Sequence, residues 1–379
     1  MEMQHIVFIH KDFPYGGAEK VTYDVANYLC SHGFMVSILT AHHHLQLYPS
    51  DARPAFNTFQ VLHGNIKASW KTARTIRDFV IKEKVFALVT YRELLYADWL
   101  KRQTGVKIVF ELHSLPYYEF IDIKEKQQHN LLTNMVYRCG FEQLLTTFYR
   151  KKYRRIYRWA DAYGVLCHAY KKKVITELGL NEDNKICVLP NPVEHPQHIK
   201  MQKQKIIAYV GRLSRRDKRV DRLLRIWQKC QKPLHDWQLS IIGSGEEEDY
   251  LQKMSQDLNL KRVSFLGYKK DMQPFYDEAA ILCMTSSFEG WPMSVAEAQA
   301  NGVVPVMFDS FDGAREMVSS PDEGVLVTPY DEEAYAISLT QLALDDSWRR
   351  QMQDGVIRKA KSYSTDRTGK KWIQMLKKL

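Results

Sequence analysis

No stretch of this sequence is apolar over the roughly 20 residues that a membrane-spanning helix needs. The first apolar run, Ile6–Ile9, follows no basic segment and is soon interrupted by Lys11 and Asp12, so we expect no secretory signal peptide. The six cysteines form no CxxC pair, and several lie in apolar runs, which favours buried reduced thiols over disulfides or a zinc site. We therefore expect a cytoplasmic protein. The cysteines are Cys30, Cys139, Cys167, Cys187, Cys230 and Cys283.

Two further signatures are missing or weak. The dinucleotide fingerprint GxGxxG is absent after the first expected strand, which argues against a dehydrogenase. His42-His43-His44 follows the second expected strand and could suggest a metal site. Adjacent residues of an extended segment point to opposite faces, which is poor geometry for chelation, so we expect a solvated loop there.

Basic residues are in excess, and the excess is uneven. The net charge is +10, of which +8 falls in residues 1–190. Its densest part is Arg150–Arg158, where cations alternate with aromatic residues. Such a stripe attracts polyanions, namely nucleic acid, an acidic membrane leaflet or a phosphorylated substrate. The alternative is one solvated helix face whose aromatic residues pack inward, and the charge run alone slightly favours it.

The remaining composition is that of a globular protein, because 45% of the residues are hydrophobic and 26% are charged. A length of 379 residues suits two domains. Short β-branched and aromatic runs alternate with amphipathic segments, which indicates parallel sheets with crossover helices. The expected strands of the first half are Ile6–Ile9, Val36–Thr40, Ala87–Thr90, Lys107–Leu112, Ala162–Leu166 and Ile186–Leu189, and those of the second half are Ile206–Val210, Trp237–Ile242, Val263–Leu266, Ala280–Met284, Val303–Phe308 and Val325–Val327.

The two halves are joined at Pro190–Pro196, where three prolines within seven residues exclude a helix or a central strand. The sequence thus predicts two doubly wound α/β domains. Ligands bind at the carboxyl ends of parallel strands, so the residues that follow the strands are the candidates for function.

Glycine-rich turns follow three of these strands. Gly16-Gly17 precedes the expected helix Ala18–Ser31, where close backbone approach and free amides suit a phosphate, although a bare pair of glycines also serves ordinary tight turns. Arg212 and Lys218 follow Gly211 in a cation-rich loop, which suits a pyrophosphate but is also typical of a solvated charge run. The turn at Gly243 leads into acidic residues, which indicates helix capping instead.

The most specific segment is Ser286–Ala298, between a strand and a helix that we expect to begin near Pro292. Glu289 lies before that helix and Glu297 inside it, while the amides of Met293 and Ser294 are available to an anion. A carboxylate can accept hydrogen bonds from two hydroxyl groups, so one acid could hold a sugar and the other a ribose. The alternative is a capped helix with an exposed glutamate.

This segment resembles the E-x7-E motif of the retaining glycosyltransferases of family 4. The resemblance extends over nearly the whole chain, in the family's order, and is of the kind found in bacterial polysaccharide and lipopolysaccharide biosynthesis. The motifs that carry it are Gly16-Gly17-Ala18-Glu19, Glu111-Leu112-His113, Leu189–Val193, Gly211-Arg212-Leu213, Phe265–Tyr268, Glu289 to Glu297, and Gly302–Val306.

The resemblance implies the GT-B fold, in which two Rossmann-like domains face a central cleft. It implies an acceptor-binding domain over residues 1–190, a nucleotide-sugar-binding domain over 191–363, and a final helix over 364–379 that crosses back to the first domain. It also implies a transfer of a hexose-type sugar, with retention at the anomeric carbon, from a UDP- or GDP-linked donor to an acceptor hydroxyl.

The family's functional residues map onto this sequence one by one. By this resemblance Arg212 and Lys218 clamp the diphosphate, helped by the amides of the Gly16-Gly17 turn, Met293 and Ser294. Glu297 holds the ribose, Glu289 holds the donor sugar, and His113 lies beside that sugar. The catalytic set is Glu289, His113, Arg212 and Lys218, and the donor-binding set is Gly16, Gly17, Arg212, Lys218, Glu289, Met293, Ser294 and Glu297.

No D-x-D pair follows a strand, so we expect no metal and no cofactor besides the donor. The expected partners are a glycan or lipid-linked acceptor and an anionic membrane surface, at the inner face of the cell membrane, but no nucleic acid. Two alternatives stay open: a sugar-nucleotide epimerase or hydrolase on the same fold, and a basic nucleic-acid-binding protein. The second lacks any helix-turn-helix, zinc-finger or ribonucleoprotein signature.

Overall fold

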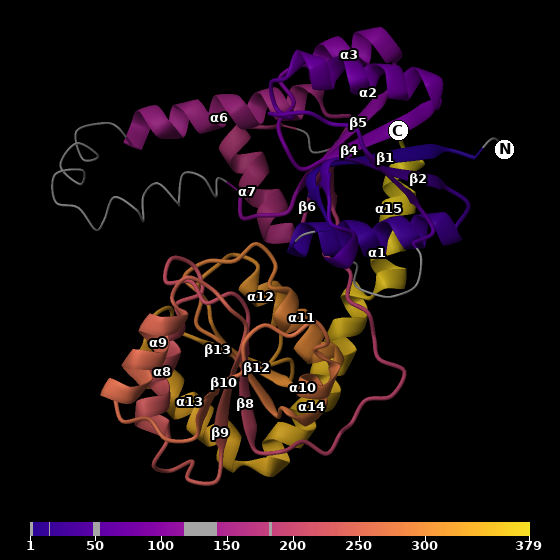
Figure 1. Cartoon of the computed structure of the whole chain (residues 1–379). Helices are drawn as coiled ribbons and strands as arrows, with labels where there is room; N and C mark the ends of the chain where they lie inside the picture. Colours follow the sequence, from indigo (N-terminus) through magenta and orange to yellow (C-terminus); the bar gives the residue numbers. More distant parts are fainter. Residues whose placement is uncertain (1–2, 15, 48–53, 117–141, 182–183) are drawn as a thin grey trace. The chain divides into compact units, whose positions relative to one another are not determined.

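A computed structural model describes residues 3–14, 16–47, 54–116, 142–181 and 184–379. It divides the chain into two compact units (Figure 1). Unit 1 consists of Met1–Pro192 and Thr365–Leu379, and unit 2 of Val193–Ser364. Each unit is built on a parallel sheet, so the expected fold class of two doubly wound α/β domains is confirmed. That the two sheets face a shared cleft stays a prediction.

The described part of unit 1 holds a sheet in the order β3-β2-β1-β4-β5-β6-β7, with all neighbours parallel. The expected strands are all present. Edge strand β3 was not predicted, because three of its four residues are polar and none of the four is buried, so it buries little apolar surface. The strands are β1 (His5–Phe13), β2 (Met35–His43), β3 (Asn57–Gln60), β4 (Val85–Thr90), β5 (Lys107–Leu112), β6 (Ala162–Val165) and β7 (Ile186–Val188).

Helices from both ends of the chain cover this sheet. The last helix, α15, packs on α1 so closely that a Cβ at Gly369 would lie 2.2 Å from the Tyr28 ring. Its Trp372 is buried beside Phe8 of β1, with ring centroids 5.8 Å apart. The C-terminal segment is therefore part of the core of unit 1. Among the described residues of this unit the helices are α1 (Gly17–Ser31), η1 (Leu45–Leu47), α2 (Trp70–Lys82), α3 (Ala97–Thr104), α6 (Glu142–Trp159), α7 (His168–Leu178) and α15 (Thr365–Leu376).

Helix α6 carries the basic stripe, and the aromatic residues within the stripe, Tyr153, Tyr157 and Trp159, are buried or half-buried, whereas Phe148 before it is exposed. Tyr153, Ile156 and Trp159 are at most 3% exposed, and Tyr157 is half-buried. The hypothesis that these aromatic residues meet a membrane is therefore wrong for this helix face, and the alternative of inward packing holds. Three of the cations also have structural partners: Arg150 pairs with Glu177, Arg154 donates to the carbonyl of Leu178, and Arg155 pairs with Glu93.

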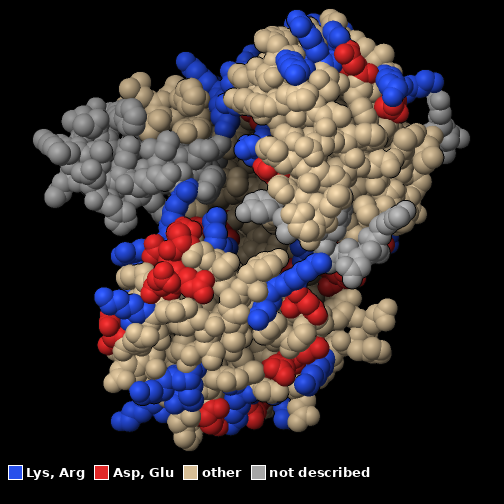
Figure 2. Space-filling view, viewed as in Figure 1, with Lys and Arg blue, Asp and Glu red and all other residues tan. Residues whose placement is uncertain are grey.

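The described part of unit 2 holds a sheet in the order β10-β9-β8-β11-β12-β13, and all six strands were expected. On the face drawn in Figure 2, its basic side chains are interspersed with acidic ones. The strands are β8 (Ile206–Val210), β9 (Gln238–Ile242), β10 (Val263–Phe265), β11 (Ile281–Met284), β12 (Val304–Phe308) and β13 (Val325–Val327). The helices are α8 (Val220–Cys230), α9 (Glu248–Asp257), α10 (Gln273–Glu278), α11 (Met293–Ala300), α12 (Ala314–Met317), α13 (Glu332–Leu344), α14 (Asp346–Ala360) and η3 (Lys361–Tyr363).

The glycines after β8 and β9 allow two loops to touch. Gly211 donates from its amide to the carbonyl of Ile242 at 3.0 Å, and Leu213 donates to Ser244 at 2.9 Å. A Cβ at Gly243, whose φ is 142°, would lie 1.8 Å from the Gly211 carbonyl oxygen. These glycines therefore serve close backbone packing, and the acidic start of α9 fits the predicted capping.

Among the described residues no helix is long and apolar enough to cross a membrane. Cys30, Cys167, Cys187, Cys230 and Cys283 are free thiols, three of them buried, as predicted. Cys139 lies outside the described residues.

Candidate active site

The loop between β8 and α8 carries the two cations predicted to bind a diphosphate. The guanidinium of Arg212 contacts Asp217 at 2.8 Å and is 62% exposed, so it is accessible to a ligand. Asp217 also accepts from Ser214, and hydrogen bonds and the nearby cations lower its pKa against the opposing effect of burial. Lys218 closes the loop immediately before α8, with a side chain that is 21% exposed.

The loop after β11 brings Glu289 to Lys218. The Lys218 ammonium donates to Glu289 Oε1 at 2.6 Å, and the Ser286 hydroxyl donates to the same oxygen at 2.7 Å. The two loops are also joined through their backbones, because the Ser287 amide donates to the carbonyl of Asp217 at 2.7 Å. Strand ends that are neighbours in the sheet thus place a cation and a carboxylate at one site.

A buried arginine holds the second loop in place. Arg222 of α8 is 9% exposed and donates to the Thr285 carbonyl and the Ser287 hydroxyl. Its guanidinium lies over the Tyr330 ring, 4.2 Å from the centroid. Because a buried cation must have its hydrogen-bonding groups satisfied, these contacts restrict the loop that presents Glu289.

Tyr209 lies beneath this group of charges. Burial raises the pKa of Tyr209 well above its ordinary value, and the charges of Glu289 and Asp217 raise it further. Its hydroxyl therefore stays neutral and donates to the carbonyl of Arg212 at 2.9 Å. A neutral tyrosine in this position fixes the loop without adding a second anion.

Helix α11 starts at Met293, one residue later than expected, because Pro292 is the N-cap and has extended backbone angles. The Pro292 carbonyl accepts from Val295 and Ala296, so the amides of Met293 and Ser294 precede the helical hydrogen-bond pattern. Glu297 lies inside α11 and accepts from the Tyr276 hydroxyl at 2.9 Å. Burial, and then the charge of Glu297, raises the pKa of Tyr276 well above its ordinary value.

In unit 1 the predicted glycines lie at the start of α1. Gly16 is its N-cap with φ of 105°, a conformation that other residues rarely adopt. A Cβ at Gly17 would meet no atom within 4 Å, so the space beside this backbone is open. A Cβ at Gly16 would instead lie 3.1 Å from a carboxylate oxygen of Glu19.

His113 belongs to a buried group of polar residues in the same unit. Its Nε2 lies 3.1 Å from Glu111 Oε2, and its side chain is 10% exposed. Burial lowers the pKa of His113, but the charge and hydrogen bond of Glu111, followed by the charge of Glu19, outweigh burial and raise the pKa above 6.5. The positively charged form of this histidine is therefore favoured relative to that of an ordinary imidazole.

The pKa of His10 is shifted in the opposite direction. This histidine is 1% exposed, it contacts the Thr22 hydroxyl at 2.9 Å and Glu19 at 3.5 Å, and burial lowers its pKa. The Tyr91 ring lies 5.0 Å from it and 6.1 Å from His113, and the Tyr91 hydroxyl donates to Glu19 at 3.3 Å. Glu19 thus connects the start of α1 to both histidines.

The structure brings the predicted residues together in three groups. Arg212, Lys218 and Glu289 share one site, Met293, Ser294 and Glu297 lie on α11, and Gly16, Gly17 and His113 belong to unit 1. The sequence interpretation assigned no role to four participants. Asp217 and Tyr276 had no separate signal, whereas His10 and Tyr91 directly follow expected apolar strands, which is the signal that could have found them.

Two of the three adjacent histidines contact one acid, and His42 and His43 belong to strand β2, so the expected loop begins only after them. His42 contacts Asp12 at 2.8 Å and His44 contacts it at 3.5 Å, and both imidazoles are at least one-third exposed. No group of three or more potential metal ligands is found within the described ranges.

Comparisons with known proteins give the family of each unit. The family model described as Glycosyltransferase Family 4 matches residues 15–196, and the model described as Glycosyl transferases group 1 matches residues 191–360. An uncharacterized glycosyltransferase of Haemophilus influenzae is 26% identical over 364 residues, which are 95% of this chain and 96% of that protein.

Two further likenesses span nearly the whole chain. A Campylobacter jejuni protein is 22% identical over 99% of this chain and 98% of its own; its name is GalNAc-alpha-(1->4)-GalNAc-alpha-(1->3)-diNAcBac-PP-undecaprenol alpha-1,4-N-acetyl-D-galactosaminyltransferase. The structure of HepE from Anabaena in complex with UDP-glucose superposes with a TM-score of 0.74 at 16% identity, covering 99% of this chain and 100% of that one. Because the two family models together span residues 15–360, and the sheets of both units are those of this fold, the chain is a glycosyltransferase with the GT-B fold.

Proposed function

We propose that this enzyme moves a hexose-type sugar from a UDP- or GDP-linked donor to a glycan acceptor, with retention at the anomeric carbon, in surface polysaccharide or lipopolysaccharide biosynthesis. The observation that carries the proposal is the contact of Lys218 with Glu289, beside the exposed guanidinium of Arg212. The HepE structure with UDP-glucose supports a nucleotide-sugar donor.

Arg212 and Lys218 bind the diphosphate of the donor. Arg212 offers a planar fork and Lys218 a point charge, which are the two usual ways in which proteins bind phosphate. Both cations already contact carboxylates, Asp217 and Glu289, so the diphosphate shares them with these acids. The amides of Met293 and Ser294 at the start of α11, and of Gly17 at the start of α1, add neutral donors.

Glu289 and Glu297 bind sugar hydroxyls. Glu289, whose Oε1 accepts from Lys218 and Ser286, is proposed to accept from a hydroxyl of the donor sugar. Glu297, whose Oε2 accepts from Tyr276, is proposed to accept from a hydroxyl of the ribose. His113 is proposed to lie beside the donor sugar, where a ring N–H can donate to a hydroxyl or phosphate oxygen.

The reaction breaks the bond between the anomeric carbon and the phosphate oxygen and forms one between that carbon and the acceptor oxygen. Negative charge develops on the departing phosphate, and preorganised cations and amides aimed at it lower the barrier. The acceptor proton passes to the leaving phosphate on the same face of the sugar, which accounts for retention without a protein base. The two cations replace a metal ion, so we propose that the enzyme needs no metal.

The acceptor is a glycan attached to a lipid, and the enzyme works at the inner face of the cell membrane. The C. jejuni relative, which is named for an undecaprenol-linked substrate, supports this acceptor class. The exposed cations of α6 support attraction to an anionic surface. Because the aromatic residues of the stripe are buried or half-buried, the stripe contributes mainly charge to such an attachment.

A screen of nucleotide sugars by thermal shift tests the donor. A donor at 100 times its Kd raises the free energy of unfolding by about 2.7 kcal/mol, which is readily detected as a higher Tm. The hit is then incubated with and without a glycan acceptor, and the anomeric proton of the product is followed by NMR. Consumption of the donor without acceptor would favour the epimerase or hydrolase alternative, and an inverted product would overturn retention. Activity that EDTA abolishes and Mn²⁺ restores would overturn the metal-independent mechanism.

A further inference from the structure

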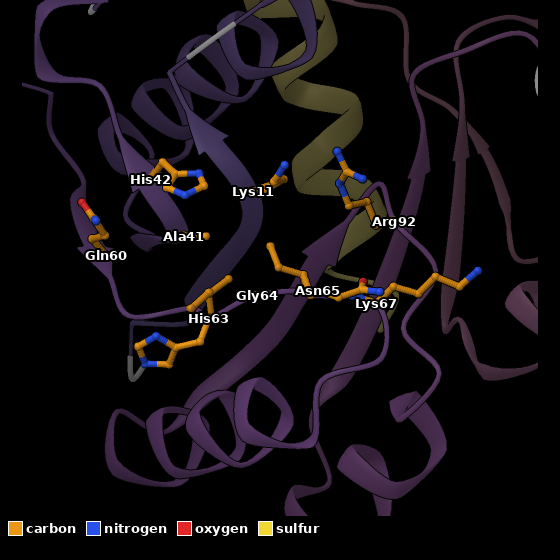
Figure 3. Close-up of a pocket in the computed structure, with 11 residues that line it drawn as sticks. Lys11, Ala41, His42, Gln60, His63, Gly64, Asn65, Lys67 and Arg92 are labelled. Carbon is orange, nitrogen blue, oxygen red and sulfur yellow. The ribbon is translucent and has the colours of Figure 1, made fainter.

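Unit 1 contains a pocket of about 740 Å³ that the proposed donor site does not use. It opens at the carboxyl ends of β1 and β2 and beside the segments that follow β3 and β4. Figure 3 shows its lining residues, which include Lys11, His42, Asn65, Lys67 and Arg92. Its position at strand ends is where parallel α/β sheets bind ligands.

Lys11 and Arg92 come from neighbouring strands. In the parallel pairing of β1 with β4, Ile9 is the partner of Thr90. Each cation follows two residues later in its own chain segment, so the two are brought to the same end of the sheet. Figure 3 shows the ends of both side chains pointing toward the same side of the pocket.

Two threonines fix the backbone beneath these cations. The Thr40 hydroxyl of β2 donates to the Lys11 carbonyl at 3.0 Å. The Thr90 hydroxyl donates to the Arg92 carbonyl at 3.0 Å and accepts from its amide at 3.1 Å. The attachment points of both cations are therefore held by buried hydrogen bonds.

The acids near the pocket already have other partners. Asp12 contacts His42 and His44, and Glu93 contacts Lys67 and Arg155. The lining contains no aspartate or glutamate. Within the described ranges neither Lys11 nor Arg92 forms an ion pair, and Arg92 lies over the Tyr91 ring at 5.1 Å. The pocket is therefore positive.

The rest of the wall combines polar side chains with the apolar Ala41, Leu62 and Ile66. Gln60, His63 and Asn65 supply hydrogen-bond donors and acceptors that suit hydroxyl groups. No Phe, Tyr or Trp lines the pocket, so it offers no broad ring for stacking a nucleotide base. Its volume lies within the usual range for small-molecule sites. A fork, a point charge and polar amides together match a sugar that carries an oxyanion.

We propose that this pocket binds an anionic sugar unit of the acceptor, through Lys11 and Arg92, with a phosphate or a carboxylate as the anion. The assignment of the ligand as part of the acceptor rests on the proposed function. The enzyme thereby selects glycan acceptors that carry negative charge.

Calorimetric titration of the full-length chain with glucose 6-phosphate, glucuronate and glucose tests the proposal. Each titration contains excess UDP, which occupies the phosphate-binding cations of unit 2. We expect the phosphate or the carboxylate sugar to bind at least tenfold more tightly than glucose, and the preferred one identifies the anion. Lys11→Gln and Arg92→Gln should each weaken that binding about tenfold, the loss of one charge-assisted contact.

Lys82→Gln and Arg102→Gln serve as controls, because both are exposed cations of unit 1 outside the pocket. They should bind like the unsubstituted chain, and a thermal melt of each variant verifies folding. Equal binding of the three sugars, or unchanged binding in both pocket variants, would overturn the proposal. Separate titration with UDP keeps the two hypotheses apart. UDP binding without anionic-sugar binding rejects only the pocket, whereas the reverse result rejects the proposed donor site.

Discussion

Lys218 and Glu289 are 71 positions apart in the chain and meet at 2.6 Å, at the ends of the neighbouring strands β8 and β11. A cation that contacts the carboxylate for the sugar can also contact the phosphate attached to that sugar. This relationship lets one site bind both sides of the bond to be broken, and it separates two kinds of mutational effect.

Glu289→Gln should keep the fold and lower turnover by about 10²–10³, since one electrostatic contact of the reacting centre is lost. Affinity for UDP should stay nearly unchanged, because UDP lacks the sugar that Glu289 is proposed to bind. Steady-state kinetics and UDP titration measure the two quantities. Glu246→Gln, an exposed acid in the loop after β9, is the matched control. Full transfer activity in Glu289→Gln would show that this site is wrongly assigned.

Glu297→Ala should have the opposite pattern. Its carboxylate is proposed to hold the ribose, so UDP should bind about 10- to 100-fold more weakly, the loss expected for one or two hydrogen bonds to a charged group. Tyr276→Phe removes only the hydroxyl that positions this carboxylate, and a smaller loss of UDP affinity is expected. Calorimetry measures both, with Glu289→Gln as the contrasting variant. UDP affinity that survives in Glu297→Ala would exclude the ribose assignment.

The charge on His113 should depend on Glu111. Removing that carboxylate in Glu111→Gln leaves burial opposed only by weaker contributions, so the pKa of His113 should fall. A histidine whose folded pKa is raised stabilises the fold below pH 6.5, and this stabilisation is lost as the pH rises through the folded pKa. In the variant this stabilisation should therefore be smaller, and its loss should be complete at a lower pH.

An NMR titration of the histidine ring protons reports the pKa of His113 directly, and urea unfolding from pH 5 to 9 reports the stability. Glu19→Gln is the graded control, because the charge of Glu19 contributes less to His113 than that of Glu111 does. If the pKa of His113 is unchanged in Glu111→Gln, a group other than Glu111 raises it.

Much of the fold was predictable because buried parallel strands are short, nearly continuous apolar runs. Strand β8 has the predicted boundaries, Ile206–Val210, for this reason. Apolar runs do not predict a strand correctly where its residues are polar or where a polar residue is buried. Strand β3 is exposed and polar, and β1 continues beyond Ile9 because His10 is buried although it is polar. Residues such as Asp217 act through contacts that only the folded loop creates.

The basic stripe of α6 gives the last prediction. Arg154 and Arg155 have structural contacts, so neutralising them would disturb unit 1 as well as any membrane contact. Lys151 and Arg158 are exposed and lie seven residues apart, on one face of the helix.

Because each cation near an anionic surface contributes about 1 kcal/mol, Lys151→Gln with Arg158→Gln should weaken binding to anionic vesicles about 30-fold. Vesicle co-sedimentation at low and high salt measures this, with Lys82→Gln and Arg102→Gln as the charge-matched control. Vesicle binding that does not change with salt concentration or lipid charge, or that weakens equally in the control variants, would exclude α6 as the site of attachment.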